Sequence, residues 1–210
     1  MKSFIYGIHS LEEAQKVLSL GADYVGFNLE EFDHKILSEI TAPIAQNTII
    51  TIHAHQLEDL DEQIRHLFCS IVHLGAHPDK LFPSVLQRLK NRFPEFQFAQ
   101  VIPVIDRYSI DIAKHFDNLA DYLFLDSFSF QSQRLGVTGK THDWGISAEI
   151  VKSCHTPVIL AGGLGPGNVS AAIKAVLPYG VATKTRTDLP DSSAKDMDKV
   201  SSFISQAKNN

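Results

Sequence analysis

The sequence has few cysteines, no excess of basic residues and no long apolar run, and each of these absences excludes a class of protein. Cys69 and Cys154 lie far apart and form no CxxC pair, which indicates reduced thiols. Lys and Arg number 19 against 24 Asp and Glu, so the net charge of −5 argues against a nucleic-acid-binding protein. No stretch approaches the ~18 apolar residues of a transmembrane helix, and no signal-peptide pattern opens the chain. We expect a cytoplasmic protein with no nucleic-acid and no membrane partner.

What is present has the composition of an ordinary globular domain. The chain has 210 residues, of which 44% are hydrophobic and 20% charged, which excludes disordered, collagen-like and coiled-coil proteins. No linker or low-complexity stretch divides it. We therefore expect a single domain over 1–210.

Short apolar runs alternate with segments of helical periodicity. The runs are mostly continuous, which is typical of strands buried on both faces. The strand candidates are Phe4–Tyr6, Tyr24–Asn28, Thr48–Ile52, Ile71–Leu74, Phe96–Ile102, Tyr122–Leu125, Val158–Leu160 and Val181–Thr183. The helix candidates are Ser10–Leu20, Leu57–Phe68, Pro78–Phe93, Ser109–Phe116, Trp144–Cys154, Gly167–Leu177 and Lys195–Ala207.

Eight strands that begin about every 25 residues predict a (β/α)₈ barrel. The structural alternative is a doubly wound open sheet, which more often has fewer strands. The first strand is not followed by the Gly-x-Gly-x-x-Gly of a dinucleotide-binding sheet. In a barrel, chemistry takes place at the C-terminal ends of the strands, and these ends hold the candidate site residues.

A glycine-rich loop follows the seventh strand candidate. Gly162 and Gly163 end the strand, and a helix begins a few residues later. Glycine lets backbone N–H groups approach an anion, and a helix N-terminus adds free donors. The loop therefore predicts a phosphate site, with a tight turn before a capped helix as the alternative.

Asp126 closes the sixth strand candidate behind an apolar run, where a carboxyl group suits general acid–base catalysis. The alternative is a loop-capping aspartate. The segment Ser127–His142 then forms a long loop with glycines, which predicts a mobile lid over the mouth. It lacks the spacing of a P-loop.

Histidines follow two neighbouring strand candidates. His53 and His55 follow the third, and His73 and His77 follow the fourth. Two imidazoles at one strand end can bind a metal ion, and Asp126 could complete the site. Solvated loop histidines are the commoner outcome, and we predict no metal.

Four segments together resemble one family. Gly136–Trp144 looks like the Gly-Gly-Thr-Gly…Phe-Asp-Trp signature of phosphoribosylanthranilate isomerase, and 21–27 is similar to that family's second strand. The segment 160–169 is similar to its phosphate loop, and Lys195-Asp196 resembles the pair before its last helix. Their order and spacing agree over essentially the whole chain.

The resemblance implies a cofactor-free barrel of tryptophan biosynthesis that carries out an Amadori rearrangement. Its substrate is a small phosphorylated sugar amine. An acid opens the sugar ring to a Schiff base, and a base removes the proton at C2. Asp126 matches the acid, and Gly162, Gly163 and Asn168 match half of the phosphate site. The implied protein is a monomer or a homodimer.

The sequence also departs from the family pattern. Tyr6 stands where the family has its base, a cysteine, and a phenol with a pKa near 10 is the poorer base at neutral pH. Lys184 and Arg186 stand where the second phosphate glycine is lost, and we expect them on one strand face, supplying charge to the phosphate. Lys35 lies near the position of an arginine that would meet the anthranilate carboxylate, in a loop that looks shortened.

Three functions are compatible with these residues. The first is a divergent isomerase that uses Tyr6, or else His9, His53 or His73, as its base. The second is another sugar-phosphate isomerase or lyase on the same barrel. The third is a paralogue that binds a ligand without catalysis. We predict the isomerase, with Asp126 and Tyr6 in the catalytic positions.

Overall fold

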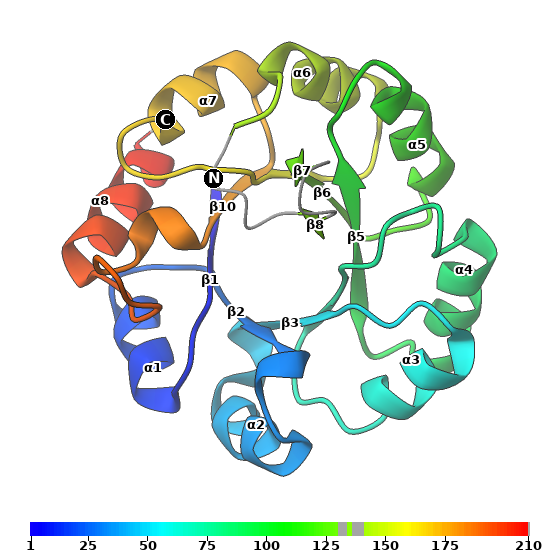
Figure 1. Cartoon of the computed structure of the whole chain (residues 1–210), viewed down its shortest axis with the longest axis horizontal. Helices are drawn as coiled ribbons and strands as arrows, with labels where there is room; N and C mark the ends of the chain where they lie inside the picture. The colour runs from blue at the N-terminus through cyan, green and yellow to red at the C-terminus, as the bar shows by residue number, and fades with distance from the viewer. Residues whose placement is uncertain (130–133, 136–140, 210) are drawn as a thin grey trace.

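The computed structural model describes residues 1–129, 134–135 and 141–209, and its core is a closed parallel barrel. Figure 1 looks down the barrel and shows β1 and β10 side by side, where the ring closes. In ring order the strands are β1 (Lys2–Tyr6), β10 (Gly180–Thr183), β9 (Val158–Leu160), β6 (Tyr122–Asp126), β5 (Gln97–Pro103), β4 (Ile71–Leu74), β3 (Thr48–Ile52) and β2 (Tyr24–Asn28).

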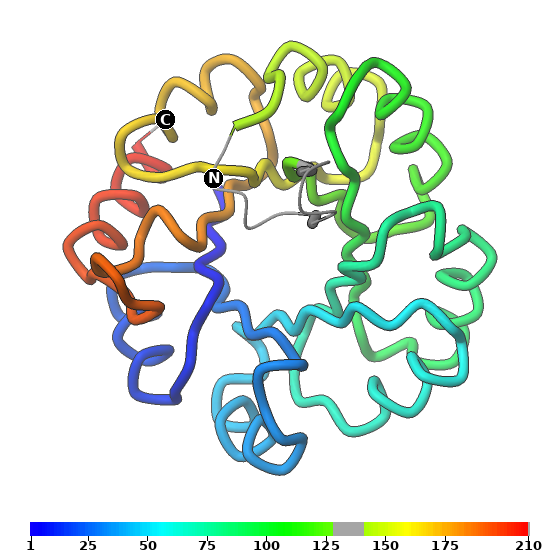
Figure 2. The backbone as a smooth tube through the Cα atoms, in the orientation of Figure 1, coloured from blue at the N-terminus to red at the C-terminus, as the bar shows by residue number. Residues whose placement is uncertain are grey.

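A ring of helices surrounds the strands (Figure 2). The α-helices are α1 (Leu11–Ser19), α2 (His34–Thr41), α3 (Leu57–Ile64), α4 (Pro83–Arg92), α5 (Tyr108–Phe116), α6 (Trp144–Ser153), α7 (Val169–Val176) and α8 (Met197–Lys208). In the described part of the chain, three short 3₁₀ helices, η1 (Leu29–Glu31), η2 (Ala42–Asn47) and η3 (Thr185–Thr187), follow β2, α2 and β10. No helix in the described residues is long and apolar enough to cross a membrane.

The predicted (β/α)₈ barrel is confirmed, because all eight strand candidates are strands and pair in parallel. The single-domain organisation over 1–210 stays a prediction. The first helix shows why the local signals worked. The Ser10 hydroxyl accepts a hydrogen bond from the Glu13 N–H, as expected of an N-cap, and the Glu13 carboxylate accepts one from the His9 N–H.

Several predicted boundaries are wrong. Helix α4, predicted to begin at Pro78, begins at Pro83, because Pro83 is the proline in its first turn. Helix α3 ends at Ile64, four residues before the predicted end at Phe68. Helix α2 was not predicted, although Asp33 caps it with two N–H contacts.

The predicted lid over 127–142 lies largely outside the described residues. The parts that the structure describes include an antiparallel pair of very short strands, β7 (Phe128–Ser129) and β8 (Arg134–Leu135). Asp143 caps α6 by accepting a hydrogen bond from the Gly145 N–H.

Side chains that face into the barrel stack in layers, because neighbours on a strand point to opposite faces. The lower layer is apolar and contains Phe4, Ile49, Ile71, Ala99 and Ala182. Two residues further along β1, β3 and β4, the inward positions carry polar side chains, which are Tyr6, Thr51 and His73, whereas β5 carries Val101. The apolar lower layer thus forms a base on which the polar side chains of the mouth rest.

Tyr6 reaches into this interior only because Gly26 on the neighbouring strand has no side chain. An added Cβ at Gly26 would lie 2.3 Å from Cδ1 of the Tyr6 ring. We expect Gly26→Ala to destabilise the fold by about 1–3 kcal/mol through overpacking. Denaturant unfolding measures this, and Gly167→Ala is the matched control, because its added Cβ meets no atom within 4 Å.

The Tyr6→Ala background removes the ring and should remove most of the penalty. An equal cost of Gly26→Ala with and without the ring would contradict the contact.

Candidate active site

A cavity with a volume of about 130 Å³ opens at the C-terminal ends of the strands. Strand alternation brings its polar lining from distant parts of the chain. The described titratable side chains in its wall are Tyr6, His53, His73, Asp126 and Lys184. The structure thus brings together both residues predicted as catalytic and part of the predicted phosphate site.

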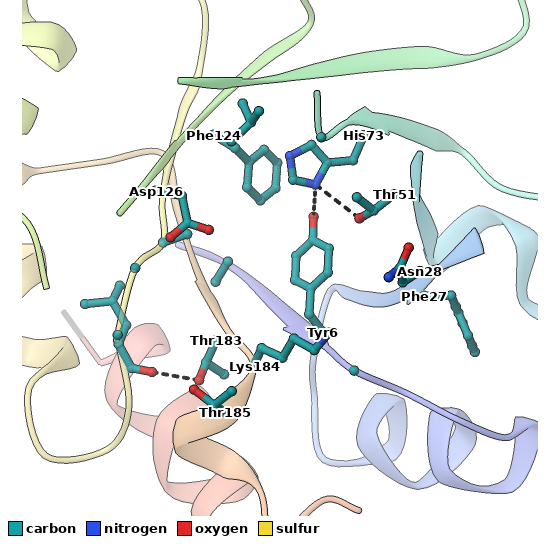
Figure 3. A pocket seen from close by; sticks show the side chains of 18 of the residues that line it. Tyr6, Phe27, Asn28, Thr51, His73, Phe124, Asp126, Thr183, Lys184 and Thr185 are labelled. Atoms are coloured by element: carbon teal, nitrogen blue, oxygen red, sulfur yellow. Dashed lines mark hydrogen bonds between the residues drawn. The ribbon is translucent and has the colours of Figure 1, made fainter. Parts of the chain in front are cut away.

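Tyr6 and His73 form the floor of the cavity. The Tyr6 hydroxyl lies 3.0 Å from Nδ1 of His73, and the Thr51 hydroxyl lies 3.4 Å from the same nitrogen. Figure 3 shows Tyr6 extending from β1 toward His73 on β4, with Thr51 beside it. His73 lies inside β4 and not after it, so its ring faces the barrel interior.

The surroundings of His73 determine which ring nitrogen carries the proton. Its Nε2 atom is buried and has no hydrogen-bond partner in the described chain, and its ring lies 4.5 Å from the Phe124 ring. Nδ1, in contrast, faces the Tyr6 and Thr51 hydroxyl groups, each of which can donate a hydrogen bond to a bare nitrogen. We assign the proton to Nε2, and Nδ1 then accepts the hydrogen bond that the Tyr6 hydroxyl donates.

Both members of this pair are neutral. Burial lowers the pKa of His73 to about 3, and the neighbouring His53 lowers it further. Burial, together with the charge of Asp126, raises the pKa of Tyr6 well above its ordinary value. Both shifts oppose moving the phenol proton onto the imidazole, so the proton stays on Tyr6.

Asp126 ends β6 at the cavity wall. Burial raises the pKa of its carboxyl group to about 6, against the opposing effect of the Ser127 N–H, which donates to Oδ1 at 2.7 Å. A carboxyl group with this pKa exists in both protonation states near neutral pH. It can therefore donate a proton to a ligand at the mouth.

Gly162 leaves room for the Asp126 carboxyl group and for the His142 imidazole. An added Cβ there would lie 3.2 Å from Asp126 Oδ1 and 2.9 Å from His142 Nδ1. His142 Nε2 shares a hydrogen bond of 2.8 Å with the Ser147 hydroxyl, and burial lowers the pKa of His142 to about 4. A neutral imidazole therefore packs near Asp126 where the family pattern has phenylalanine.

The glycine loop offers backbone donors to the cavity. The N–H groups of Gly162, Gly163 and Leu164 donate to no other described residue. Asn168 closes the loop, because its Oδ1 accepts from Gly165 N and its Nδ2 donates to the Gly163 carbonyl. Asn168 therefore shapes the loop with the side chain that the sequence suggested for phosphate contact.

Lys184 provides a cation on the same side of the cavity. Its Nζ lies 3.4 Å from a Glu31 oxygen, so the lysine is paired when no ligand is bound. The buried Lys195 ammonium donates to the Lys184 carbonyl at 3.0 Å and pairs with Asp188. Lys195 thereby fixes the backbone next to Lys184. The sequence signalled Lys195 only as the start of a helix candidate and through the resemblance, and it gave no signal for Glu31.

Two predicted binding residues lie elsewhere. Strand β10 ends at Thr183, so the expectation that Lys184 and Arg186 share a strand face is wrong. Arg186 lies in η3 and lines a separate surface pocket with Lys199 and the outer side of the glycine loop. Lys35 is exposed on α2 and does not line the cavity. The reason is that helix α2 occupies the predicted loop.

The four histidines considered as metal ligands do not all line the cavity. Of the four weighed as metal ligands, His53 and His73 line the cavity, whereas His55 and His77 do not. Among residues 1–129, 134–135 and 141–209, no group of three or more His, Cys, Asp or Glu side chains is placed to hold a metal ion.

Comparison with known proteins settles the family. A family model described as N-(5'phosphoribosyl)anthranilate (PRA) isomerase matches residues 4–206. The N-(5'-phosphoribosyl)anthranilate isomerase 2 of Methanosarcina mazei is 33% identical over 222 residues, which cover 100% of this chain and 95% of that protein. The chain belongs to the PRA isomerase family. Membership assigns it the function of a PRA isomerase of tryptophan biosynthesis, an intramolecular oxidoreductase.

Solved structures share the fold. Monomers generated from the dimeric PRA isomerase of Thermotoga maritima superpose with a TM-score of 0.83 at 21% identity, over 100% of both chains. A PRA isomerase in complex with reduced 1-(o-carboxyphenylamino)-1-deoxyribulose 5-phosphate gives 0.78 at 20% identity, again over 100% of both chains. At these identities the likeness shows the barrel alone.

The raised pKa of Asp126 predicts a pH-dependent stability. The native carboxyl group has a pKa of about 6 and the unfolded one of about 3.9, so stability falls as the pH rises from about 4 to about 6, and the full loss is present above pH 6. We expect Asp126→Asn to stabilise this PRA isomerase by up to about 3 kcal/mol at pH 7.5, and by much less at pH 4. Urea unfolding at the two pH values measures the difference.

The exposed N-cap Asp143 is the control, because Asp143→Asn should give no such gain on raising the pH. A stabilisation by Asp126→Asn that is equal at both pH values would contradict the raised pKa.

Proposed function

We propose that this PRA isomerase opens its substrate with Asp126 as the general acid and without a cofactor. The substrate is a small phosphorylated sugar amine, and the reaction is the Amadori rearrangement of phosphoribosylanthranilate. The observation that carries this proposal is the pKa of Asp126, about 6, at the wall of the same cavity as the glycine loop. A carboxyl group that retains its proton near neutral pH can protonate the ring oxygen of a bound sugar.

The phosphate, in this proposal, binds between the loops after β9 and β10. The Gly162 and Gly163 N–H groups donate from one side, and Lys184 approaches from the other. Binding of the phosphate then requires the ion pair between Lys184 and Glu31 to break. Asn168 contributes indirectly by holding the glycine loop.

Tyr6, in the position of the family's base, has a different role in this proposal. Its raised pKa and its hydrogen bond to His73 support a neutral phenol that forms the cavity floor. Such a phenol is a poor proton acceptor. The same observation favours the alternative of a barrel that binds a ligand without catalysis, and turnover distinguishes the two functions.

We also infer that the protein works in the cytoplasm. Both cysteines are free thiols, and Cys69 is buried, which suits a reducing compartment. Monomer and homodimer remain the two candidate assemblies.

We expect the native protein to convert phosphoribosylanthranilate, and Asp126→Asn to lower kcat/KM by on the order of 10²–10⁴-fold, because the amide cannot donate the proton. Loss of the substrate's fluorescence in a continuous assay measures the rate. Asp106→Asn is the matched control, since Asp106 follows a neighbouring strand but lies outside the cavity lining. A native protein without turnover would leave ligand binding as the function, and full activity in Asp126→Asn would remove Asp126 from the acid role.

A second experiment locates the phosphate. We expect Lys184→Met to weaken binding of ribose 5-phosphate by about 10–100-fold, since a charge-assisted hydrogen bond contributes roughly 1.5–3 kcal/mol. Isothermal titration measures the affinity. Arg186→Ala should change it less than threefold, because Arg186 lines the separate surface pocket. The reverse order of effects would place the phosphate in the Arg186 pocket.

A further inference from the structure

Isomerisation needs a proton acceptor for C2 as well as an acid for the ring oxygen. Tyr6 and His73 are both unsuited, because the phenol keeps its proton and the imidazole has a pKa of about 3. Asp126 serves as the acid, and Lys184 is an ammonium paired with a carboxylate. Among the described residues of the lining, this leaves His53.

His53 is positioned to face a ligand. It lies two residues after Thr51, so it projects from the same face of the chain, which is the inner face of the barrel. Gly75 at the end of β4 leaves space for its ring. An added Cβ at Gly75 would lie 3.1 Å from both Cδ2 and Nε2 of His53. The imidazole therefore leans over the end of β4, one layer above the Tyr6–His73 floor.

Glu30 orients this imidazole. A Glu30 carboxylate oxygen lies 3.5 Å from His53 Nδ1. A carboxylate beside Nδ1 favours the tautomer with its proton on that nitrogen, which leaves the lone pair on Nε2. Nε2 has no hydrogen-bond partner in the described chain. A base whose second nitrogen faces a carboxylate is the usual arrangement for activating an imidazole.

His9, the other histidine named by the sequence, lacks this position. It lies outside the cavity lining, with its Nδ1 3.8 Å from Glu31 and its ring beside Phe32.

We propose that His53, oriented by Glu30, is the general base that removes the C2 proton, a role that rests on the proposed isomerase function. Asp126 first protonates the ring oxygen; the C1–O bond breaks, and the nitrogen lone pair forms the C=N bond of a Schiff base. His53 Nε2 then takes the proton from C2. The C–H electron pair forms C1=C2, and the C=N pair returns to nitrogen. The enolamine gains a proton at C1 and loses one from the 2-hydroxyl, which gives the ketone, so no oxidant or reductant is needed.

The test compares His53→Asn with His55→Asn in the full-length enzyme. His55 lies two residues along the same loop but outside the cavity lining. We expect His53→Asn to lower kcat by on the order of 10²–10⁴-fold with KM changed less than threefold, because a base acts in the chemical step. His55→Asn should keep kcat within threefold of native. Thermal unfolding verifies that both variants are folded.

Substrate deuterated at C2 separates a base from a structural residue. The remaining turnover of His53→Asn should show a primary isotope effect at least as large as that of the native enzyme, since C2–H cleavage has become slow. Glu30→Gln should give a smaller loss of kcat with the same sign of change.

A third variant tests the same step by replacing Tyr6 on the cavity floor. Tyr6→Cys introduces a thiol with an ordinary pKa near 8.5 beside the ligand. In that background His53→Asn should cost less than a tenth of its effect in the native chain. Equal losses in both backgrounds, full activity in His53→Asn, or a loss without an isotope effect would each overturn the proposal. A native enzyme with no turnover at all would instead refute the proposed function.

Discussion

The hydrogen bond between the Tyr6 hydroxyl and His73 Nδ1, 3.0 Å long, constrains everything above it in the barrel. It ties β1 to β4 across the interior, where burial keeps both the phenol and the imidazole neutral. Because neither partner exchanges protons readily, the floor of the cavity is chemically quiet. Proton transfer is therefore left to groups one layer nearer the mouth.

That upper layer follows from strand alternation on a barrel. Asp126 lies two residues beyond Phe124, and His53 two residues beyond Thr51, so each stands above a side chain that contacts His73 of the floor. Burial raises the pKa of the Asp126 carboxyl group, and the Glu30 carboxylate orients His53. A barrel that has lost one reactive side chain can thus place another on a different strand, since every inward position at the same height faces the same ligand.

The fold could be predicted from the sequence because it depends on local and repeated signals. Continuous apolar runs mark strands buried on both faces, and the cap at Ser10 marks the start of the first helix, whereas the proline rule selected Pro78 in place of Pro83. Helix α2 was missed because its first turn, Asp33–Ile36, has the composition of a loop, and its stability comes from the cap and from packing through Leu37.

The site could be predicted only in part. Position at a strand end identified Asp126 and Tyr6, and the glycine pattern identified the loop at Gly162. The contacts of Tyr6 with His73 and of Lys184 with Glu31 join residues 67 and 153 positions apart in the chain. No spacing rule predicts such pairs, because they depend on which inward positions of a closed ring face each other. The prediction for Lys35 was wrong because a loop was assumed there, whereas Lys35 lies on helix α2, outside the cavity lining.

The protonation of His73 tests the central claim most directly. Nitrogen-15 NMR of the histidine rings, with His73→Gln to assign the signals, reports which nitrogen carries the proton. The account predicts a neutral ring with its proton on Nε2 from pH 5 to pH 8, and an Nδ1 that accepts the Tyr6 hydrogen bond. A His73 ring that becomes cationic within that range, or that carries its proton on Nδ1, would contradict it.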